Sequence, residues 1–194
     1  MDEIKRVAIV GFGSLGAMYT GCFGRAMGAD GVFVVADTAR TAAYRAEPTI
    51  FNGEPIAATY LTYDEAAARA ATTPFDVVLY AVKFGALAEA MEQSAPLVGA
   101  DTAIISVLNG VTSEEVLAER FGWDRVLLCV AQQMDSRKVG PVVTAGCVGV
   151  LALGVRDGES PVQQANLSRV TAWLSAIDQP FICPKDIRHQ LWGK

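Results

Sequence analysis

Six residues near the amino terminus, Gly11-Phe12-Gly13-Ser14-Leu15-Gly16, directly follow the apolar run Val7 to Val10. A G-x-G-x-x-G turn between a strand and a helix brings bare backbone amides up to a pyrophosphate. The first glycine permits the tight turn, the second leaves room for the phosphate, and the third lets helix and strand pack closely. The helix amino terminus adds partial positive charge. The loop predicts dinucleotide binding; the alternative is a purely structural turn.

Asp37 and Arg40 are the candidates for recognising the adenosine end of such a ligand. Rossmann-type sites carry a ribose-binding side chain about twenty residues after the glycines, at the end of the second strand, where Asp37 stands. A carboxylate accepts hydrogen bonds from both ribose hydroxyls and repels a 2′-phosphate, so Asp37 favours NAD over NADP. Arg40 reverses this preference if it reaches the phosphate. The structural alternative is that Asp37 caps the next helix.

Two more polar residues follow successive predicted strands. Lys83 comes after residues 77–82, and Asn109 comes after residues 104–108. Ligands of doubly wound folds bind at the carboxyl ends of the strands, so both side chains would face the cofactor crevice. Each residue also has a simpler interpretation, Lys83 as a solvated boundary residue and Asn109-Gly110 as a turn.

A nicotinamide-dependent reduction of a carbonyl also needs an acid to protonate the oxygen. The only histidine, His189, has no carboxylate evidently placed to orient it, which argues against that role. Tyr80 precedes Lys83 by three residues at a strand end. That is not the helical spacing that places a tyrosine beside a lysine in short-chain dehydrogenases, so we expect Tyr80 in the core.

The elements that would position these residues alternate along the chain. Short β-branched runs and Ala-rich stretches at helical spacing predict an α/β fold, Rossmann-type and doubly wound, with a mostly parallel sheet. The expected strands are residues 4–10, 32–36, 76–82, 103–108 and 126–132. The expected helices are residues 14–27, 38–45, 64–71, 85–94 and 113–121, the last with a capping-type start at Thr112.

The pattern changes after Gly140-Pro141. The apolar runs 142–144 and 148–153 predict a β-hairpin appendage in place of another βαβ unit. A helix over 160–176 and a short strand over 181–183 follow.

Asp186 is expected to cap a final helix. Ile187, Leu191 and Trp192 share one face of it and would contact something outside these residues. We therefore expect a homo-oligomer that forms through this helix.

Composition excludes several classes of protein. The 194 residues carry a net charge of −5, with 52% hydrophobic and 19% charged residues, and the mean hydropathy is +0.30. Strands buried on both faces explain this apolar content. The acidic balance argues against a nucleic-acid partner, which needs a basic face. No apolar stretch approaches the roughly 20 residues that cross a bilayer, so we expect neither a signal peptide nor a membrane partner.

The cysteine pattern bears on metal binding and location. No C-x-x-C pair occurs among the four cysteines, and apolar neighbours favour buried, reduced thiols over zinc ligands. We expect no metal site and a cytoplasmic location. The residues concerned are Cys22, Cys129, Cys147 and Cys183.

Four short motifs in a particular order extend over essentially the whole chain. They are Gly11 to Gly16, Ala81-Val82-Lys83, Leu108-Asn109-Gly110-Val111 with Glu114-Glu115, and Asp186-Ile187 ahead of Leu191-Trp192-Gly193-Lys194. In order and spacing they resemble the ketopantoate reductase (2-dehydropantoate 2-reductase) family. The resemblance implies a Rossmann domain, here residues 1–185, followed by an all-helical domain. Only the start of its interdomain helix, residues 186–194, lies within this chain.

The resemblance also implies roles for individual residues. In the family, NADPH and a 2-keto acid lie in the cleft between the two domains. By resemblance, Lys83 and Asn109 line the nicotinamide side, and Lys194 is the general acid. Many members carry an arginine where this chain has Asp37, so the choice between NADP(H) and NAD(H) stays open. The pyrophosphate would be held by Gly11, Phe12, Gly13, Ser14, Leu15 and Gly16.

The activity that the resemblance implies is reduction of a 2-keto acid, by default 2-dehydropantoate to pantoate in pantothenate biosynthesis. One alternative is an NAD(P)-binding or sensing domain without turnover. Another is a dehydrogenase for a different 2-hydroxy acid. In the family the substrate-binding residues follow Lys194, so we expect residues 1–194 alone to bind cofactor but to be nearly inactive.

Overall fold

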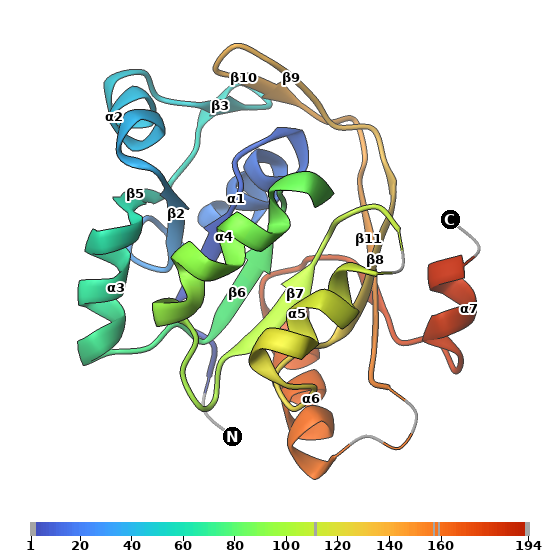
Figure 1. The fold of residues 1–194 in the computed structure, drawn as a ribbon. Coiled ribbons are helices and arrows are strands. Elements are labelled where there is room, and N and C mark those ends of the chain that lie inside the picture. The colour runs from blue at the N-terminus through green and yellow to red at the C-terminus, as the bar shows by residue number, and fades with distance from the viewer. Residues whose placement is uncertain (1–2, 111, 157, 159, 193–194) are drawn as a thin grey trace.

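A five-stranded parallel sheet forms the centre of the chain (Figure 1), in a computed structural model that describes residues 3–110, 112–156, 158 and 160–192. Because β1 lies between β2 and β6, the strand order reverses beside it, which is the topological switch point of a doubly wound fold. The predicted Rossmann-type architecture is confirmed. The strands, in spatial order, are β5 (Thr59–Thr62), β2 (Val32–Ala36), β1 (Val7–Val10), β6 (Val77–Tyr80) and β7 (Ala103–Ser106).

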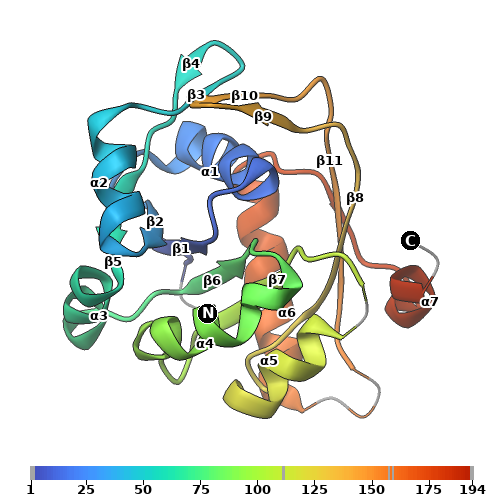
Figure 2. The ribbon, with the colours of Figure 1, turned by 45° about the horizontal axis from the view of Figure 1, so that its top comes forward.

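The side chains of this sheet divide the core into two layers. Successive residues of a strand point to opposite faces. Val7 and Ile9 accordingly belong to one apolar cluster, and Ala8 and Val10 belong to the other. One face is covered by α1 (Ser14–Met27) and α6 (Pro161–Ala176), and the other by α3 (Tyr63–Thr72), α4 (Leu87–Ser94) and α5 (Ser113–Phe121) (Figure 2).

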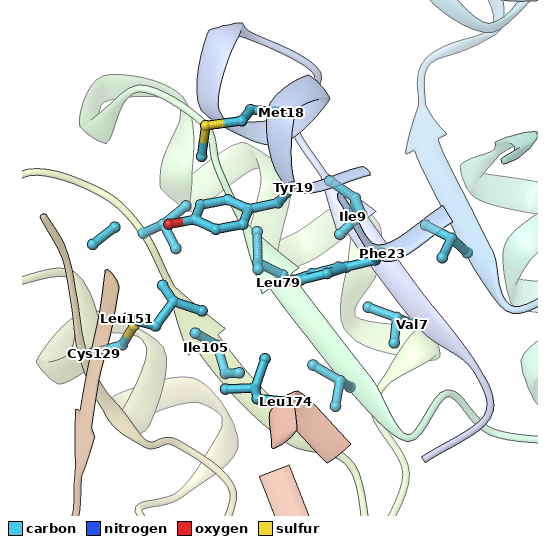
Figure 3. Packing of buried hydrophobic residues seen from close by; sticks show 14 of the residues in the cluster. Val7, Ile9, Met18, Tyr19, Phe23, Leu79, Ile105, Cys129, Leu151 and Leu174 are labelled. Atoms are coloured by element: carbon cyan, nitrogen blue, oxygen red, sulfur yellow. The ribbon is translucent and has the colours of Figure 1, made fainter. Parts of the chain in front are cut away.

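The layer on the α1 side also includes residues from late in the chain. In Figure 3, Tyr19 and Phe23 of α1 lie beside Leu79 of the sheet, and Leu151 and Leu174 pack into the same cluster. All five side chains are fully buried. The parallel sheet and the antiparallel part of the chain therefore share one core.

That antiparallel part is a long ribbon, residues 128–154. Its outer strands, β8 (Leu128–Met134) and β11 (Val148–Gly154), pair with each other in antiparallel orientation. Strand β11 also pairs in parallel with β12 (Phe181–Ile182). Its inner strands form a hairpin that pairs with β3 (Ile50–Phe51), which in turn pairs with β4 (Glu54–Pro55), and the hairpin passes over α1 in both ribbon views. The ribbon consists of β8 (Leu128–Met134), β9 (Arg137–Val139), β10 (Val142–Thr144) and β11 (Val148–Gly154).

The predicted antiparallel appendage is present, and the strand expected over 126–132 largely coincides with β8, but two details of the prediction are wrong. The expected strand 126–132 does not join the parallel sheet; only Val126 makes an isolated bridge to Ile104, and the chain then turns into β8. The runs 142–144 and 148–153 do not pair with each other. Pairing β11 with β8 joins two seven-residue strands, whereas the expected hairpin would use only the three residues of β10.

Most of the remaining local predictions are confirmed to within a few residues. Helices α1 and α5 match the expected bounds, and α2 (Thr38–Ala46) is one residue longer than expected. The stretch expected as one helix over 85–94 divides into the 3-10 turn η1 (Phe84–Ala86) and α4. A second 3-10 turn, η2 (Ala95–Leu97), follows α4. Strands β3, β4, β5 and β9 were not predicted.

Cysteine burial differs from the prediction. Cys129 is buried and Cys22 is half-buried, and burial raises the pKa of the Cys22 thiol to about 11. Cys147 and Cys183 are exposed, which contradicts the expectation of four buried thiols. Within the part of the chain that the structure describes, no group of three or more His, Cys, Asp or Glu side chains is placed to hold a metal ion.

The carboxy-terminal helix α7 (Ile187–Trp192) packs on the ribbon, and Asp186 caps it by accepting a hydrogen bond from the backbone N–H of His189. The expectation that Ile187 faces outward is wrong, because it packs against Leu128 and Val130 and is 6% exposed. Leu191 is half-buried in the same cluster. Self-association through α7 stays a prediction. No described helix is long and apolar enough to span a membrane.

Candidate functional site

The three glycines of the loop after β1 meet different surroundings. Gly11 has a φ of +100°, and a Cβ there would lie 2.7 Å from the carbonyl carbon of Ala81. A Cβ on Gly16 would overlap the carbonyl oxygen of Gly11. A Cβ on Gly13, by contrast, would have no heavy atom within 4 Å, and its φ of −73° suits any residue. The fold therefore requires Gly11 and Gly16, whereas Gly13 only leaves space open.

Helix α1 begins at this open space. Its N-cap is Gly13, which has no side chain to satisfy the first backbone N–H groups, and its first turn contains no acidic residue. The first four N–H groups of a helix lack intrahelical partners and carry partial positive charge. The amino terminus of α1 is thus available to an anionic ligand, and the predicted phosphate-binding residues have a geometry that fits a pyrophosphate.

Two ribbon residues reach the loop from far along the sequence. Ser136 donates a hydrogen bond to the carbonyl oxygen of Ser14 at 3.0 Å, and the two hydroxyl oxygens lie 2.6 Å apart. The ammonium of Lys138 donates to the carbonyl oxygen of Phe12 at 2.8 Å. These pairs are 122 and 126 residues apart in sequence. Ser136 and Lys138 were not predicted as site residues, because neither belongs to a local motif.

Lys138 lies against a cluster of aromatic rings. Its Nζ is 4.4 Å from the centre of the Phe12 ring and 5.6 Å from that of Tyr44. The Phe12 ring packs on Tyr44 and Tyr60, with centroid distances of 4.9 and 5.7 Å. Burial lowers the pKa of the Lys138 ammonium. Phe12 thus supplies a backbone carbonyl and a ring face, both of which orient Lys138.

Asp37 and Arg40 interact with each other at the start of α2. Asp37 Oδ1 accepts a hydrogen bond from the backbone N–H of Arg40 at 2.8 Å, and Asp37 Oδ2 lies 3.1 Å from Arg40 Nη1. The capping alternative for Asp37 is therefore realised. A ribose or 2′-phosphate at this position would meet an ion pair whose side chains are 44% and 73% exposed. Their roles in ribose recognition and cofactor preference stay predictions.

Lys83 and Asn109 lie at the same edge of the sheet as the glycine loop. The sheet hydrogen bonds continue past the ends of the strands, with the Ala81 N–H donating to Val10 and the Val107 N–H donating to Tyr80. Lys83 and Asn109 follow these bonds, and both are exposed. Nothing in this geometry identifies them as nicotinamide contacts, so that role stays a prediction.

Tyr80 belongs to the core, as expected. Its side chain is fully buried, and its hydroxyl lies 2.7 Å from Ser94 Oγ. Lys194 lies outside the described residues.

A buried hydrogen-bonded chain supports the loop that carries Asn109. Ser113 Oγ lies 2.8 Å from Ser106 Oγ and donates to Glu114 Oε2 at 2.8 Å. The Glu114 residue is 1% exposed, and its carboxylate also accepts from the backbone N–H of Cys129 in β8. Burial raises the pKa of this carboxyl group. The expected cap at Thr112 is wrong, because its side chain makes no capping hydrogen bond.

Comparison with known proteins gives one family. Residues 7–157 match the family model described as ketopantoate reductase PanE/ApbA. A search of curated proteins gave no match.

Solved structures share the fold. A 2-dehydropantoate 2-reductase from Geobacter metallireducens is 23% identical, with a TM-score of 0.76 over 96% of this chain and 60% of its own. A PanE/ApbA family ketopantoate reductase from Ralstonia eutropha is 21% identical, with a TM-score of 0.75 over 96% and 59%. D-mandelate dehydrogenase, solved with NADH and anilino(oxo)acetate, is 16% identical, with a TM-score of 0.77 over 96% and 59%. This chain thus spans about three fifths of their length.

Proposed function

The chain belongs to the ketopantoate reductase family, and we propose that it is the cofactor-binding part of an NAD(P)H-dependent reductase that converts a 2-keto acid to a 2-hydroxy acid. The observation that carries this proposal is the open space at Gly13 beside the uncapped amino terminus of α1. The default substrate is 2-dehydropantoate, reduced to pantoate in pantothenate biosynthesis. Because the relatives are longer, the activity is proposed for the whole protein.

Each proposed role follows from a position at the sheet edge. The N–H groups at the start of α1 bind the pyrophosphate. Asp37 and Arg40 meet the adenosine ribose, and Lys83 and Asn109 flank the nicotinamide at the ends of β6 and β7. The nicotinamide, when bound, supplies the hydride for the keto carbon.

Reduction also requires a proton for the carbonyl oxygen. By resemblance to the family we assign that donation to the ammonium of Lys194, with Lys83 as the second candidate. The donor must lie over the substrate when the hydride arrives, and Lys194 follows α7 by two residues in the sequence.

The fold shared with D-mandelate dehydrogenase keeps another 2-hydroxy acid as an alternative product. A nucleotide-sensing domain without turnover is the other alternative. We also propose a cytoplasmic location and self-association through α7. The net negative charge of the chain argues against a nucleic-acid partner, and the absence of a long apolar stretch in these residues argues against a membrane partner.

Cofactor binding is tested with the substitution Gly13→Val. The added side chain fills the open space at the loop, so we expect calorimetric titration with NADPH and NADH to show binding to the wild type and none to the variant. Thermal unfolding should change little, because the Cβ meets no protein atom. Ala71→Val, on the exposed end of α3, is the control and should bind normally. Equal affinity of Gly13→Val and wild type contradicts the assignment.

The reaction is tested on the whole protein. Oxidation of NADPH and NADH is followed spectrophotometrically with 2-dehydropantoate and with aromatic and short aliphatic 2-keto acids. We expect the highest kcat/KM with 2-dehydropantoate. A higher kcat/KM with another 2-keto acid would support a dehydrogenase for a different 2-hydroxy acid. Cofactor binding without turnover of any of these acids would support a nucleotide-sensing domain.

A further inference from the structure

We propose that Lys138, on the ribbon, binds a phosphate group of the dinucleotide. This inference rests on the proposed function and adds a residue that the glycine loop does not contain. It assigns to the ribbon a part in cofactor recognition, in addition to its packing over α1.

The pairing of β9 turns Lys138 toward the loop. Lys138 is opposite Val143 of β10, and Val143 is fully buried. The neighbouring residues Arg137 and Val139 are exposed, as the alternation of a strand requires. Lys138 therefore extends from the inner face of the hairpin, the same face from which Ser136 contacts Ser14.

The Phe12 carbonyl and the rings of Phe12 and Tyr44 orient the Lys138 ammonium, but none of these groups carries a negative charge. An ammonium has three N–H donors, and the carbonyl of Phe12 accepts one of them. None of the ion pairs among the described residues includes Lys138. Its side chain is half-buried against Phe12 and Tyr44, where a cation is poorly solvated. Such a group gains most from an anion.

Lys138 lies between the two parts of the proposed site that would meet phosphate groups. Phe12 belongs to the loop whose next residue, Gly13, borders the open space at the start of α1. Tyr44 belongs to α2, the helix that Asp37 caps at the adenosine end of the proposed site. Lys138 contacts both residues and is therefore placed to reach either the pyrophosphate or the 2′-phosphate of NADP(H). The two phosphates share one chemistry, and NADH lacks the second.

The test is to remove the charge and measure affinity. Lys138→Met keeps an apolar stem over the Phe12 ring and removes the ammonium, and Arg137→Met removes the same charge from the exposed face of the same strand. We titrate wild type and both variants with NADPH and NADH by calorimetry. Lys138→Met should weaken binding by about 10-fold or more, the usual effect of losing a charged hydrogen bond. Arg137→Met should change it less than about twofold.

Each outcome has a defined meaning. A loss confined to NADPH assigns Lys138 to the 2′-phosphate, and an equal loss for both nucleotides assigns it to the pyrophosphate. Unchanged affinity in Lys138→Met, or an equal loss in Arg137→Met, overturns the inference and leaves the proposed function standing. A wild type that binds neither nucleotide overturns both.

A second measurement needs no substitution. Bound NADPH should protect Lys138 from acetylation by acetic anhydride, as measured by mass spectrometry, whereas the exposed Lys5 should react equally with and without nucleotide. Equal acetylation of Lys138 in both conditions also overturns the inference.

Discussion

The glycine loop, residues 11–16, and the ribbon, residues 128–154, meet at the same proposed phosphate site but are built in different ways. The contacts that shape the loop start within it or in the adjacent strand end, such as Gly16 against Gly11 and Gly11 against Ala81. The ribbon contacts the loop through residues more than 100 positions apart, such as Ser136 with Ser14 and Lys138 with Phe12. The loop thus needs its own strand and helix and the end of the neighbouring strand β6, whereas the ribbon needs the completed core.

Backbone conformation shows the same contrast. In the loop the left-handed conformation falls on Gly11, a residue without a Cβ. In the ribbon, Gln133 has a φ of +63° opposite Gly149, whose φ is +69°. From there the chain continues to Ser136 and to Lys138 in β9. Packing thus imposes a left-handed backbone conformation on Gln133, although a residue with a Cβ does not favour that conformation.

The largest expected effect comes from the loop. Gly16→Ala places a Cβ on the carbonyl oxygen of Gly11, a backbone atom that cannot move without displacing the loop. We expect the free energy of unfolding to fall by about 3 kcal/mol, the upper end of the ordinary cost of overpacking. Urea denaturation measures this loss.

Gly13→Ala is the matched control and should change the free energy of unfolding by less than about 1 kcal/mol, because its Cβ meets no atom. Similar losses in the two variants would show that the structure does not distinguish the second glycine from the third.

A smaller effect is expected where the ribbon joins the sheet edge. Glu114 accepts hydrogen bonds from Ser113 and from the Cys129 N–H of β8, and burial raises the pKa of its carboxyl group above the ordinary 4.5. The folded state therefore holds this proton at higher pH than the unfolded chain does. The stability from that proton is fully present below pH 4.5 and is lost as the pH rises through the folded pKa.

Glu114→Gln removes this titration. The difference in melting temperature between wild type and variant should shift in favour of the variant as the pH rises from 4.5, and should level off once the carboxyl group is ionised in both states. The conservative variant Glu115→Gln, on the exposed neighbour, is the control, and its difference from wild type should vary less with pH because that side chain faces solvent. A constant difference between wild type and Glu114→Gln would contradict the assignment.

The smallest effect concerns the left-handed residue Gln133 in the ribbon. Gln133→Gly relieves a left-handed conformation and should raise the free energy of unfolding by about 0.5 to 1 kcal/mol, after the entropic cost of glycine. Gln132→Gly, at a regular paired position opposite Val150, should lower it by about as much. Chemical denaturation of both variants gives the signs, and equal signs would mean that Gln133 is not strained.

Much of the parallel part of the fold was predicted because its signals are local. Helix α1 begins and ends at the predicted residues, and α5 does also. A helix depends on hydrogen bonds and side-chain spacing within a few residues, which the sequence displays directly. The two-residue strand β3 and the paired strand β9 carry no such pattern, and both were missed.

By itself, the sequence determined the glycine loop, the helix after it and the doubly wound sheet, since strand, turn and helix chemistry act between near neighbours. For Asp37 the sequence allowed two roles, a helix cap and a ribose contact. The structure shows the cap, and the ribose contact stays a prediction. Only the tertiary structure decided the pairing of β8 with β11, the burial of Ile187 and the approach of Lys138 to Phe12. These contacts join distant residues, and the burial of a shared core selects them.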